Sequence, residues 1–145
     1  MVDVYDPFVM KKVFISYTMR DDYITTTLLL KIEADVSKYN SCYIDFLHND
    51  SENKQERVEI EVQKSKFLVL LKSESISKSN WVQRELKLAL KNDIKVIDIV
   101  IDKLKTESEI SHLVVKAIKA NKKFQSTAGS AVHFQRSFLY QSLVC

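Results

Sequence analysis

The sequence predicts an α/β protein in which one parallel sheet is covered by helices on both faces. Three observations predict this class. Short apolar runs of strand length alternate along the chain with segments whose apolar residues recur at helical spacing. The runs are continuous, as in strands that are buried on both faces. The alternation of strand and helix repeats at least four times, and such an order produces parallel strands joined by helical crossovers.

The first half of the chain supplies two expected strands and two expected helices. KKVFISY, residues 11–17, is the first strand, and Asp21 and Asp22 are plausible caps of the helix that follows. The apolar residues of that helix recur at helical spacing: Ile24, Leu28, Ile32 and Val36. CYIDF, residues 42–46, is the second strand, and after a polar loop a charged helix is expected over residues 54–64.

The second half continues the alternation. FLVLL, residues 67–71, is the third strand, and an amphipathic helix with Ser79 or Asn80 as its cap follows. KVIDIVI, residues 95–101, is the fourth strand, and a further helix is expected over about residues 107–121.

The tail predicts a short fifth strand at KKFQS, residues 122–126, and a last helix over residues 131–144. With so few elements, a flavodoxin-like three-layer fold is favoured, with four or five strands in the order 2-1-3-4-5. We therefore expect a single domain over residues 1–145 with its core at about 11–121. In this order a crevice opens beyond the carboxyl ends of strands one and three.

Composition excludes several functional classes. A net charge of +3 without a continuous basic stripe argues against nucleic acid as a partner. Two cysteines and three scattered histidines match neither a disulfide framework nor a metal site. A single glycine excludes Gly-rich phosphate loops. With no membrane-length apolar run and no secretory signal, we expect a cytoplasmic protein that does not bind membranes.

One carboxylate violates the pattern of the helix after strand three. At about 100° per residue, Glu85 lies at about 40° from Trp81, inside the apolar arc. A buried unpaired carboxylate costs several kcal/mol, so two interpretations remain open. Glu85 either forms a structural ion pair or lines a cavity and faces a ligand. The candidate ion-pair partners are three basic residues: Lys12, Arg20 and Arg57.

A phosphoacceptor receiver with the same strand order is excluded. Such a protein needs an acidic pair just after strand one and an Asp at the end of strand three to hold Mg²⁺. Strand three ends at Leu71–Lys72–Ser73, and Asp21 and Asp22 lie several residues beyond strand one. We expect no metal site.

Four stretches, in order, match the pattern of a known family. VFISY (13–17) is a strand ending in Ser-Tyr, and CYIDF (42–46) has Ile-Asp before a loop. VQKSKFLVLLKSESISKSNWVQRELKLAL (62–90) contains a strand followed by a Ser-x-Trp-x-x-x-Glu-Leu helix, and KVIDIVI (95–101) is the next strand. Together they resemble the TIR (Toll/interleukin-1 receptor) domain family over nearly the whole chain, with the loop after CYIDF corresponding to its BB loop.

The resemblance implies an activity and a site. Many TIR domains cleave NAD⁺ at the nicotinamide–ribose bond, and the Glu of the Trp-x-x-x-Glu helix, Glu85 here, is their catalytic residue. The substrate pocket maps onto residues at the ends of strands one to three and on this helix: Tyr17, Thr18, Arg20, Asp45, Phe46, Ser73 and Trp81. NAD⁺ would be the substrate, and no cofactor is expected.

Several of these pocket residues have structural alternatives. Trp81 at a helix start can be a packing anchor, and Arg20 can be a solvated loop charge instead of a phosphate ligand. Asp45 can cap its loop, and Ser73 can be a turn residue.

The resemblance favours a bacterial-type stand-alone TIR enzyme. It would act in antiphage (Thoeris-like) defence, either by making an ADP-ribose-derived signal that a separate effector senses or by depleting NAD⁺. Self-association through TIR–TIR contacts is implied, because a neighbouring BB loop completes many such sites. The alternative is a non-catalytic adaptor that acts by TIR–TIR association alone.

Overall fold

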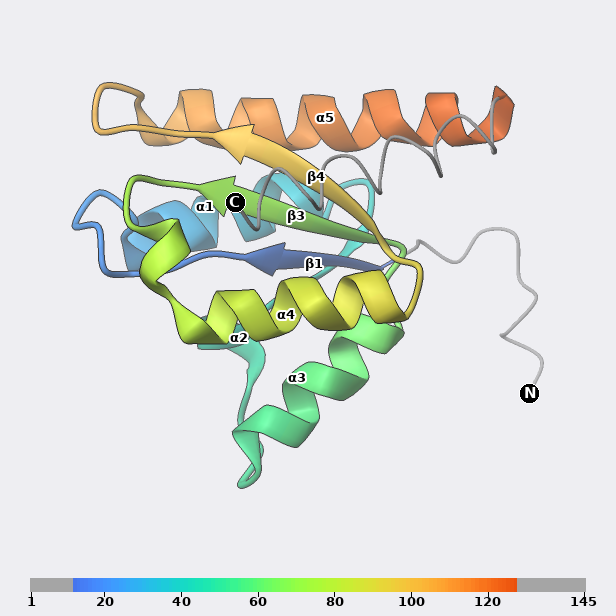
Figure 1. The fold of residues 1–145 in the computed structure, drawn as a ribbon. Coiled ribbons are helices and arrows are strands. Elements are labelled where there is room, and N and C mark those ends of the chain that lie inside the picture. The colour runs from blue at the N-terminus through green and yellow to red at the C-terminus, as the bar shows by residue number, and fades with distance from the viewer. Residues whose placement is uncertain (1–11, 128–145) are drawn as a thin grey trace.

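A four-stranded parallel sheet forms the centre of the computed structural model, which describes residues 12–127 (Figure 1). The strands lie in the order β2-β1-β3-β4. Their bounds are Lys12–Ser16 for β1, Ser41–Ile44 for β2, Phe67–Lys72 for β3 and Lys95–Val100 for β4. The predicted α/β class and flavodoxin-like order are confirmed over these four strands.

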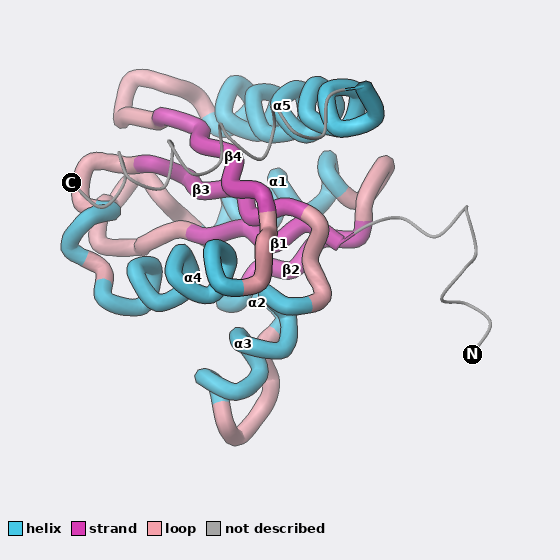
Figure 2. Tube along the Cα trace, turned by 45° about the vertical axis from the view of Figure 1, so that its right-hand side comes forward, coloured by secondary structure: helices cyan, strands magenta, loops and turns pink. Residues whose placement is uncertain are grey.

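Helices cover both faces of the sheet (Figure 2). Those described are α1 (Thr26–Val36), α2 (Asp45–His48), α3 (Lys54–Gln63), the 3₁₀ helix η2 (Ile76–Lys78), α4 (Asn80–Lys91) and α5 (Glu107–Thr127). α1 packs against α5 on one face, and α3 packs against α4 on the other. The strands are therefore enclosed on both sides, which explains why their sequences are continuously apolar.

Two hydrophobic cores lie on the two faces because successive strand residues point in opposite directions. Val13 and Ile15 of β1 face the core beneath α1 and α5, whereas Phe14 faces the core beneath α3 and α4. The second core also holds Val82 and Leu86, so it anchors the α4 face that carries Glu85.

Side-chain caps fix where three helices begin. Thr25 accepts a hydrogen bond from the backbone N–H of Leu28 at the start of α1, and Ser79 accepts one from Val82 at the start of α4. Asn53 caps α3 in the same way. The cap predicted at Ser79 is confirmed, but the caps predicted at Asp21 and Asp22 are wrong, because α1 begins several residues later.

Two further boundaries differ from the predictions. The second strand ends at Ile44, because Asp45 already begins the short helix α2. The fifth strand predicted at 122–126 is wrong: α5 continues through Thr127, and no glycine or proline occurs before Gly129 to end it. The helix predicted over residues 131–144 lies outside the described residues. Within residues 12–127, no helix has the length and apolar character needed to cross a bilayer.

Candidate active site

Glu85 is a buried carboxyl group at the carboxyl edge of the sheet. It lies on the inner face of α4, and only 3% of its surface is exposed. The hydroxyl group of Ser16 donates a hydrogen bond to Glu85 Oε1 at 2.7 Å. Because Ser16 is the last residue of β1, Glu85 lies at the carboxyl edge of the sheet, where the predicted strand order places a crevice.

The cations considered as partners of Glu85 are engaged elsewhere or exposed. Lys12 Nζ lies 2.6 Å from Glu61 Oε1, and Arg57 Nε lies 2.8 Å from Glu61 Oε2. Arg20 is exposed. Among residues 12–127, the structure gives Glu85 no cationic partner, so the ion-pair interpretation is not supported.

The environment of Glu85 favours its neutral form. Burial, together with the negative charge of Asp45, raises the pKa of Glu85 to about 8, although hydrogen bonding from Ser16 and Trp81 acts in the opposite direction. At neutral pH the carboxyl group of the free protein is therefore mostly protonated. Buried carboxyl groups with perturbed pKa values are common at functional sites.

Tyr17 and Asp45 belong to the same edge of the sheet. The Tyr17 hydroxyl oxygen accepts a hydrogen bond from the backbone N–H of Phe46 at 2.8 Å, which joins the end of β1 to α2. Burial raises the pKa of the Tyr17 hydroxyl, and the charges of Asp45 and Glu85 add to this effect. The three acidic groups therefore lie within electrostatic reach of one another, with Phe46 exposed beside them.

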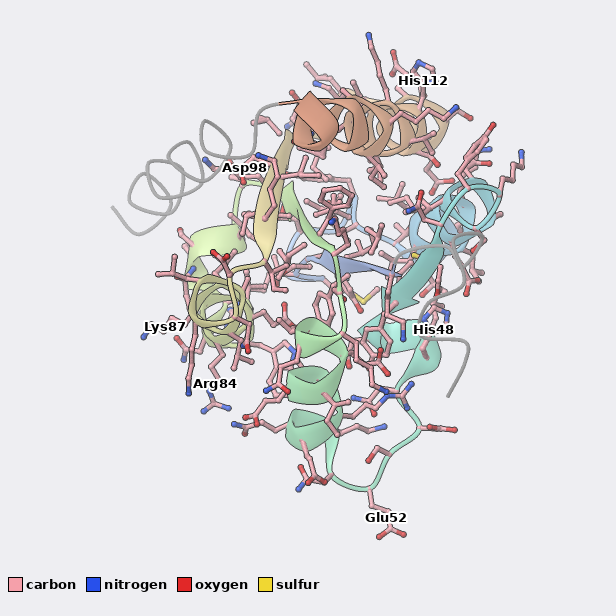
Figure 3. The ribbon with its side chains drawn as sticks, turned by 90° about the vertical axis from the view of Figure 1, so that its right-hand side faces the viewer. His48, Glu52, Arg84, Lys87, Asp98 and His112 are labelled. Atoms are coloured by element: carbon pink, nitrogen blue, oxygen red, sulfur yellow. The ribbon has the colours of Figure 1, made fainter. Side chains whose placement is uncertain are left out.

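Asp45 also organises the loop that follows the second strand. Its Oδ1 accepts hydrogen bonds from Tyr43 Oη and Asn49 Nδ2, both at 2.8 Å. The capping alternative for Asp45 is thus supported. His48 lies close by on α2 (Figure 3). Its Nδ1 accepts a hydrogen bond from the backbone N–H of Ile44 at 2.9 Å, and its Nε2 contacts Glu33.

Sequence reasoning missed Ser16, Tyr43 and His48 as parts of this arrangement. Ser16 belongs to the VFISY stretch (13–17), so the sequence already indicated that it lies at the end of a strand. His48 follows Ile44 by four residues, but this helical spacing becomes informative only once α2 is known.

The space beside Glu85 is small. Glu85 and three neighbours on α4 face α3 across a hollow of about 10 Å³, which is roughly the space of one water molecule. The lining residues are Gln55, Val58, Glu59, Trp81, Arg84, Glu85 and Leu88. Arg84 Nη1 donates a hydrogen bond to Gln55 Oε1 at 2.8 Å, which links the two helices. An aromatic ring does not fit into this hollow as it stands.

Trp81 lies one turn before Glu85 on α4 and is half-buried. It packs at the border of the core beneath α3 and α4, and it also lines the hollow. The packing and ligand-facing interpretations of Trp81 are therefore compatible.

The remaining predicted pocket residues lie in two loops. Thr18 is buried, and its hydroxyl oxygen accepts a hydrogen bond from the backbone N–H of Arg20 at 3.3 Å. Ser73 is buried after β3 and lines a different, wider groove of about 680 Å³ at the ends of β3 and β4. The structure thus gathers Tyr17, Asp45 and Glu85 at one place, and Ser73 lines another.

Asp21 joins the two loops instead of capping a helix. Its carboxylate accepts hydrogen bonds from the backbone N–H and the hydroxyl group of Ser75 at 2.9 and 2.8 Å. Although burial acts to raise it, the pKa of Asp21 is lowered by these hydrogen bonds. Asp21 therefore fixes the loop after β1 against the loop after β3.

A comparison with protein families identifies the chain. A family model described as TIR domain matches residues 13–131, which is most of the sequence. The chain belongs to the TIR domain family. This agrees with the Trp81–Glu85 helix and with the sheet order.

No curated protein matches this TIR domain. Among solved structures, it is similar to the TIR domains of the activated Roq1 resistosome that directly recognizes the pathogen effector XopQ. The two share 17% identity with a TM-score of 0.46, over 93% of this chain and 84% of that one. Within residues 12–127 of this chain, no group of three or more His, Cys, Asp or Glu side chains could hold a metal ion.

Proposed function

We propose that this TIR domain cleaves NAD⁺ between nicotinamide and ribose, with Glu85 as the catalytic residue. The observation that supports this most directly is a carboxyl group buried at the carboxyl edge of the sheet, without a cationic partner in the described residues. Its place in the Trp-x-x-x-Glu helix of a TIR domain points the same way.

A single carboxylate suffices for this chemistry. Glycosidases of the common type use two, because an alkoxide leaving group must be protonated. In NAD⁺ the electron pair of the breaking C–N bond neutralises the pyridinium ring, so nicotinamide leaves as a neutral molecule. The ribosyl group becomes a cation of oxocarbenium character, and an ionised Glu85 stabilises it in a site of low dielectric. Water then adds to the cation and loses a proton, which gives ADP-ribose.

The proposed roles of the neighbouring residues follow from their positions. Trp81 lines the hollow and offers an aromatic face to the nicotinamide ring. Tyr17, directly after β1, and Phe46 on α2 are joined by a hydrogen bond, and we assign their rings as stacking faces for the nicotinamide or the adenine. Arg20, exposed on the loop after β1, is placed to bind a phosphate group.

We further propose that assembly and signalling accompany the reaction. In this proposal, contacts between TIR domains widen the hollow at Glu85, and a separate effector senses the nucleotide product in a cytoplasmic antiphage response. Family membership and the narrow hollow support the assembly step.

The test is incubation of concentrated protein with NAD⁺, followed by chromatography and mass analysis of the products. Wild type should release nicotinamide and an ADP-ribose product, whereas Glu85→Gln should lose at least about 100-fold in rate. Glu56→Gln, the same change at an exposed position on α3, should retain wild-type turnover. Equal turnover by wild type and Glu85→Gln would overturn the proposal.

A second candidate function is a non-catalytic adaptor that binds other TIR domains. The observation that favours it is the hollow of about 10 Å³, which is too small for a nicotinamide ring as it stands. Protein that self-associates in light scattering but leaves NAD⁺ intact at every concentration would establish this function instead.

A further inference from the structure

The surroundings of Glu85 distinguish strongly between a neutral and an ionised carboxyl group. The side chain is nine-tenths or more buried, and its hydrogen-bond donor from outside α4 is the hydroxyl group of Ser16. Neutral donors such as this hydroxyl group do not compensate a full negative charge that has been removed from water. A protonated carboxyl group, in contrast, is tolerated there.

Charged and titratable groups near this carboxyl group lie on α2, on α3, on α4 itself and directly after β1. Tyr17, directly after β1, and Asp45 on α2 lie within its electrostatic reach, and Glu59 on α3 and Arg84 on α4 line the hollow beside it. The one cation among them, Arg84, is exposed and donates to Gln55. Figure 3 shows Arg84 projecting from α4 away from the sheet. Acidic groups therefore predominate around Glu85, and they favour positive charge in a ligand.

We propose that Glu85 makes this site selective for the charge of the ligand ring: a cationic ring displaces the carboxyl proton to solvent, whereas a neutral ring of the same shape leaves it in place. The inference rests on the proposed function for the position of the ring and specifies its substrate class. Oxidised pyridinium nucleotides are accepted, and their reduced, uncharged dihydropyridine forms are rejected.

The proposal predicts the number of protons released on binding and the change of affinity with pH. With a pKa of about 8, Glu85 in the free protein is about nine-tenths protonated at pH 7. A cationic ring that ionises the group then releases about one proton per ring bound at pH 7, and few protons at pH 9. The affinity for a cation should rise by up to about tenfold per pH unit between pH 6 and 8. The affinity for a neutral ring should not rise.

Two uncleavable rings allow a direct test. 1-Methylnicotinamide is a pyridinium cation without ribose, and nicotinamide is the neutral ring of nearly the same shape. Because both must widen the hollow in the same way, their difference isolates the ring charge. Binding is measured from pH 6 to pH 9 by the fluorescence of Trp81, the single tryptophan of the chain. Titration calorimetry in two buffers of different ionisation enthalpy counts the released protons.

Wild type should bind 1-methylnicotinamide at least about tenfold more tightly than nicotinamide at pH 8, with proton release at pH 7. Glu85→Gln, which keeps the shape of the side chain but cannot ionise, should bind the two rings with similar affinity and release no proton. Glu56→Gln should behave like wild type, and circular dichroism checks that each variant is folded. Equal affinities in the wild type, no proton release, or no binding of 1-methylnicotinamide at any pH would overturn the inference.

The binding test of this inference and the cleavage test of the proposed function can fail independently. NAD⁺ cleavage without charge selectivity would retain the enzymatic proposal and overturn this inference. Charge-selective, proton-linked binding without NAD⁺ cleavage would overturn the enzymatic proposal and retain the inference.

Discussion

The hydroxyl group of Ser16 and the carboxyl group of Glu85 lie 2.7 Å apart, although 69 residues separate them in the sequence. Both residues are buried, so this hydrogen bond forms in a medium of low dielectric, where it is stronger than in water. It joins the last residue of β1 to the inner face of α4. This hydrogen bond thereby connects the VFISY stretch (13–17) to the Trp-x-x-x-Glu helix.

Ser16→Ala should shift the pH dependence of NAD⁺ cleavage to higher pH. The Ser16 hydroxyl group favours the ionised form of Glu85, so its loss raises the pKa of Glu85 above about 8. We expect kcat/KM at pH 7 to fall about three- to tenfold, with recovery at alkaline pH. Ser16→Thr retains a hydroxyl group and should restore the wild-type profile. A uniform loss at all pH values would instead indicate a packing defect.

Glu85→Gln should stabilise the protein, and increasingly so as the pH rises. The folded-state pKa of Glu85 is raised, from 4.5 to about 8. Below pH 4.5 both folded and unfolded chains hold the proton, so the folded state is not penalised. Between pH 4.5 and 8 the unfolded chain ionises while the folded one does not, and wild type loses stability relative to the variant. The difference in the free energy of unfolding should grow to about 3–5 kcal/mol by pH 8.

Urea denaturation of wild type and Glu85→Gln at pH 5, 6.5 and 8 measures this difference. Glu56→Gln is the matched control, and its difference from wild type should stay small and nearly constant over this range, because Glu56 is exposed. A Glu85→Gln difference that does not change with pH would show that Glu85 is already ionised in the folded protein.

Tyr17→Phe should loosen α2 without disturbing the sheet. The Tyr17 hydroxyl oxygen accepts the backbone N–H of Phe46, and the exposed position of Phe46 leaves that N–H with little other protection. Hydrogen exchange of the Phe46 amide should accelerate about tenfold, which corresponds to roughly 1.4 kcal/mol. Tyr23→Phe is a matched control, since Tyr23 accepts the N–H of Glu74 in another loop. It should accelerate exchange at Glu74 and not at Phe46.

Much of the fold could be predicted because the burial of a strand or helix determines which of its residues are apolar. The strands are enclosed on both faces, so their apolar runs are continuous. Glu85 could be placed on the inner face of its helix because the angular position of a residue on a helix follows from its number. Both inferences use only the local pattern of apolar and polar residues.

The features that sequence missed depend on contacts between distant segments. The sequence could not show that Asp21 connects the loop after β1 to the loop after β3, because its hydrogen-bond partner Ser75 is 54 residues away. The short helix at Asp45 is fixed by hydrogen bonds from Tyr43 and Asn49, which an apolar pattern does not encode. The small size of the hollow depends on how closely α3 packs against α4, so a crevice could be predicted but not its volume.

Glu61 should show the opposite pH dependence from Glu85. Burial acts to raise the pKa of Glu61, but hydrogen bonds and charge from Lys12 and Arg57 lower it overall. Because the folded-state pKa is lowered, this stabilisation is present above the unfolded value of 4.5 and is lost as the pH falls through the folded value. Glu61→Gln should therefore destabilise the protein by about 2 kcal/mol at pH 7, and by less below pH 4. Urea denaturation at both pH values measures it, and a penalty that grows on acidification would contradict the assignment of Glu61 as the partner of both cations.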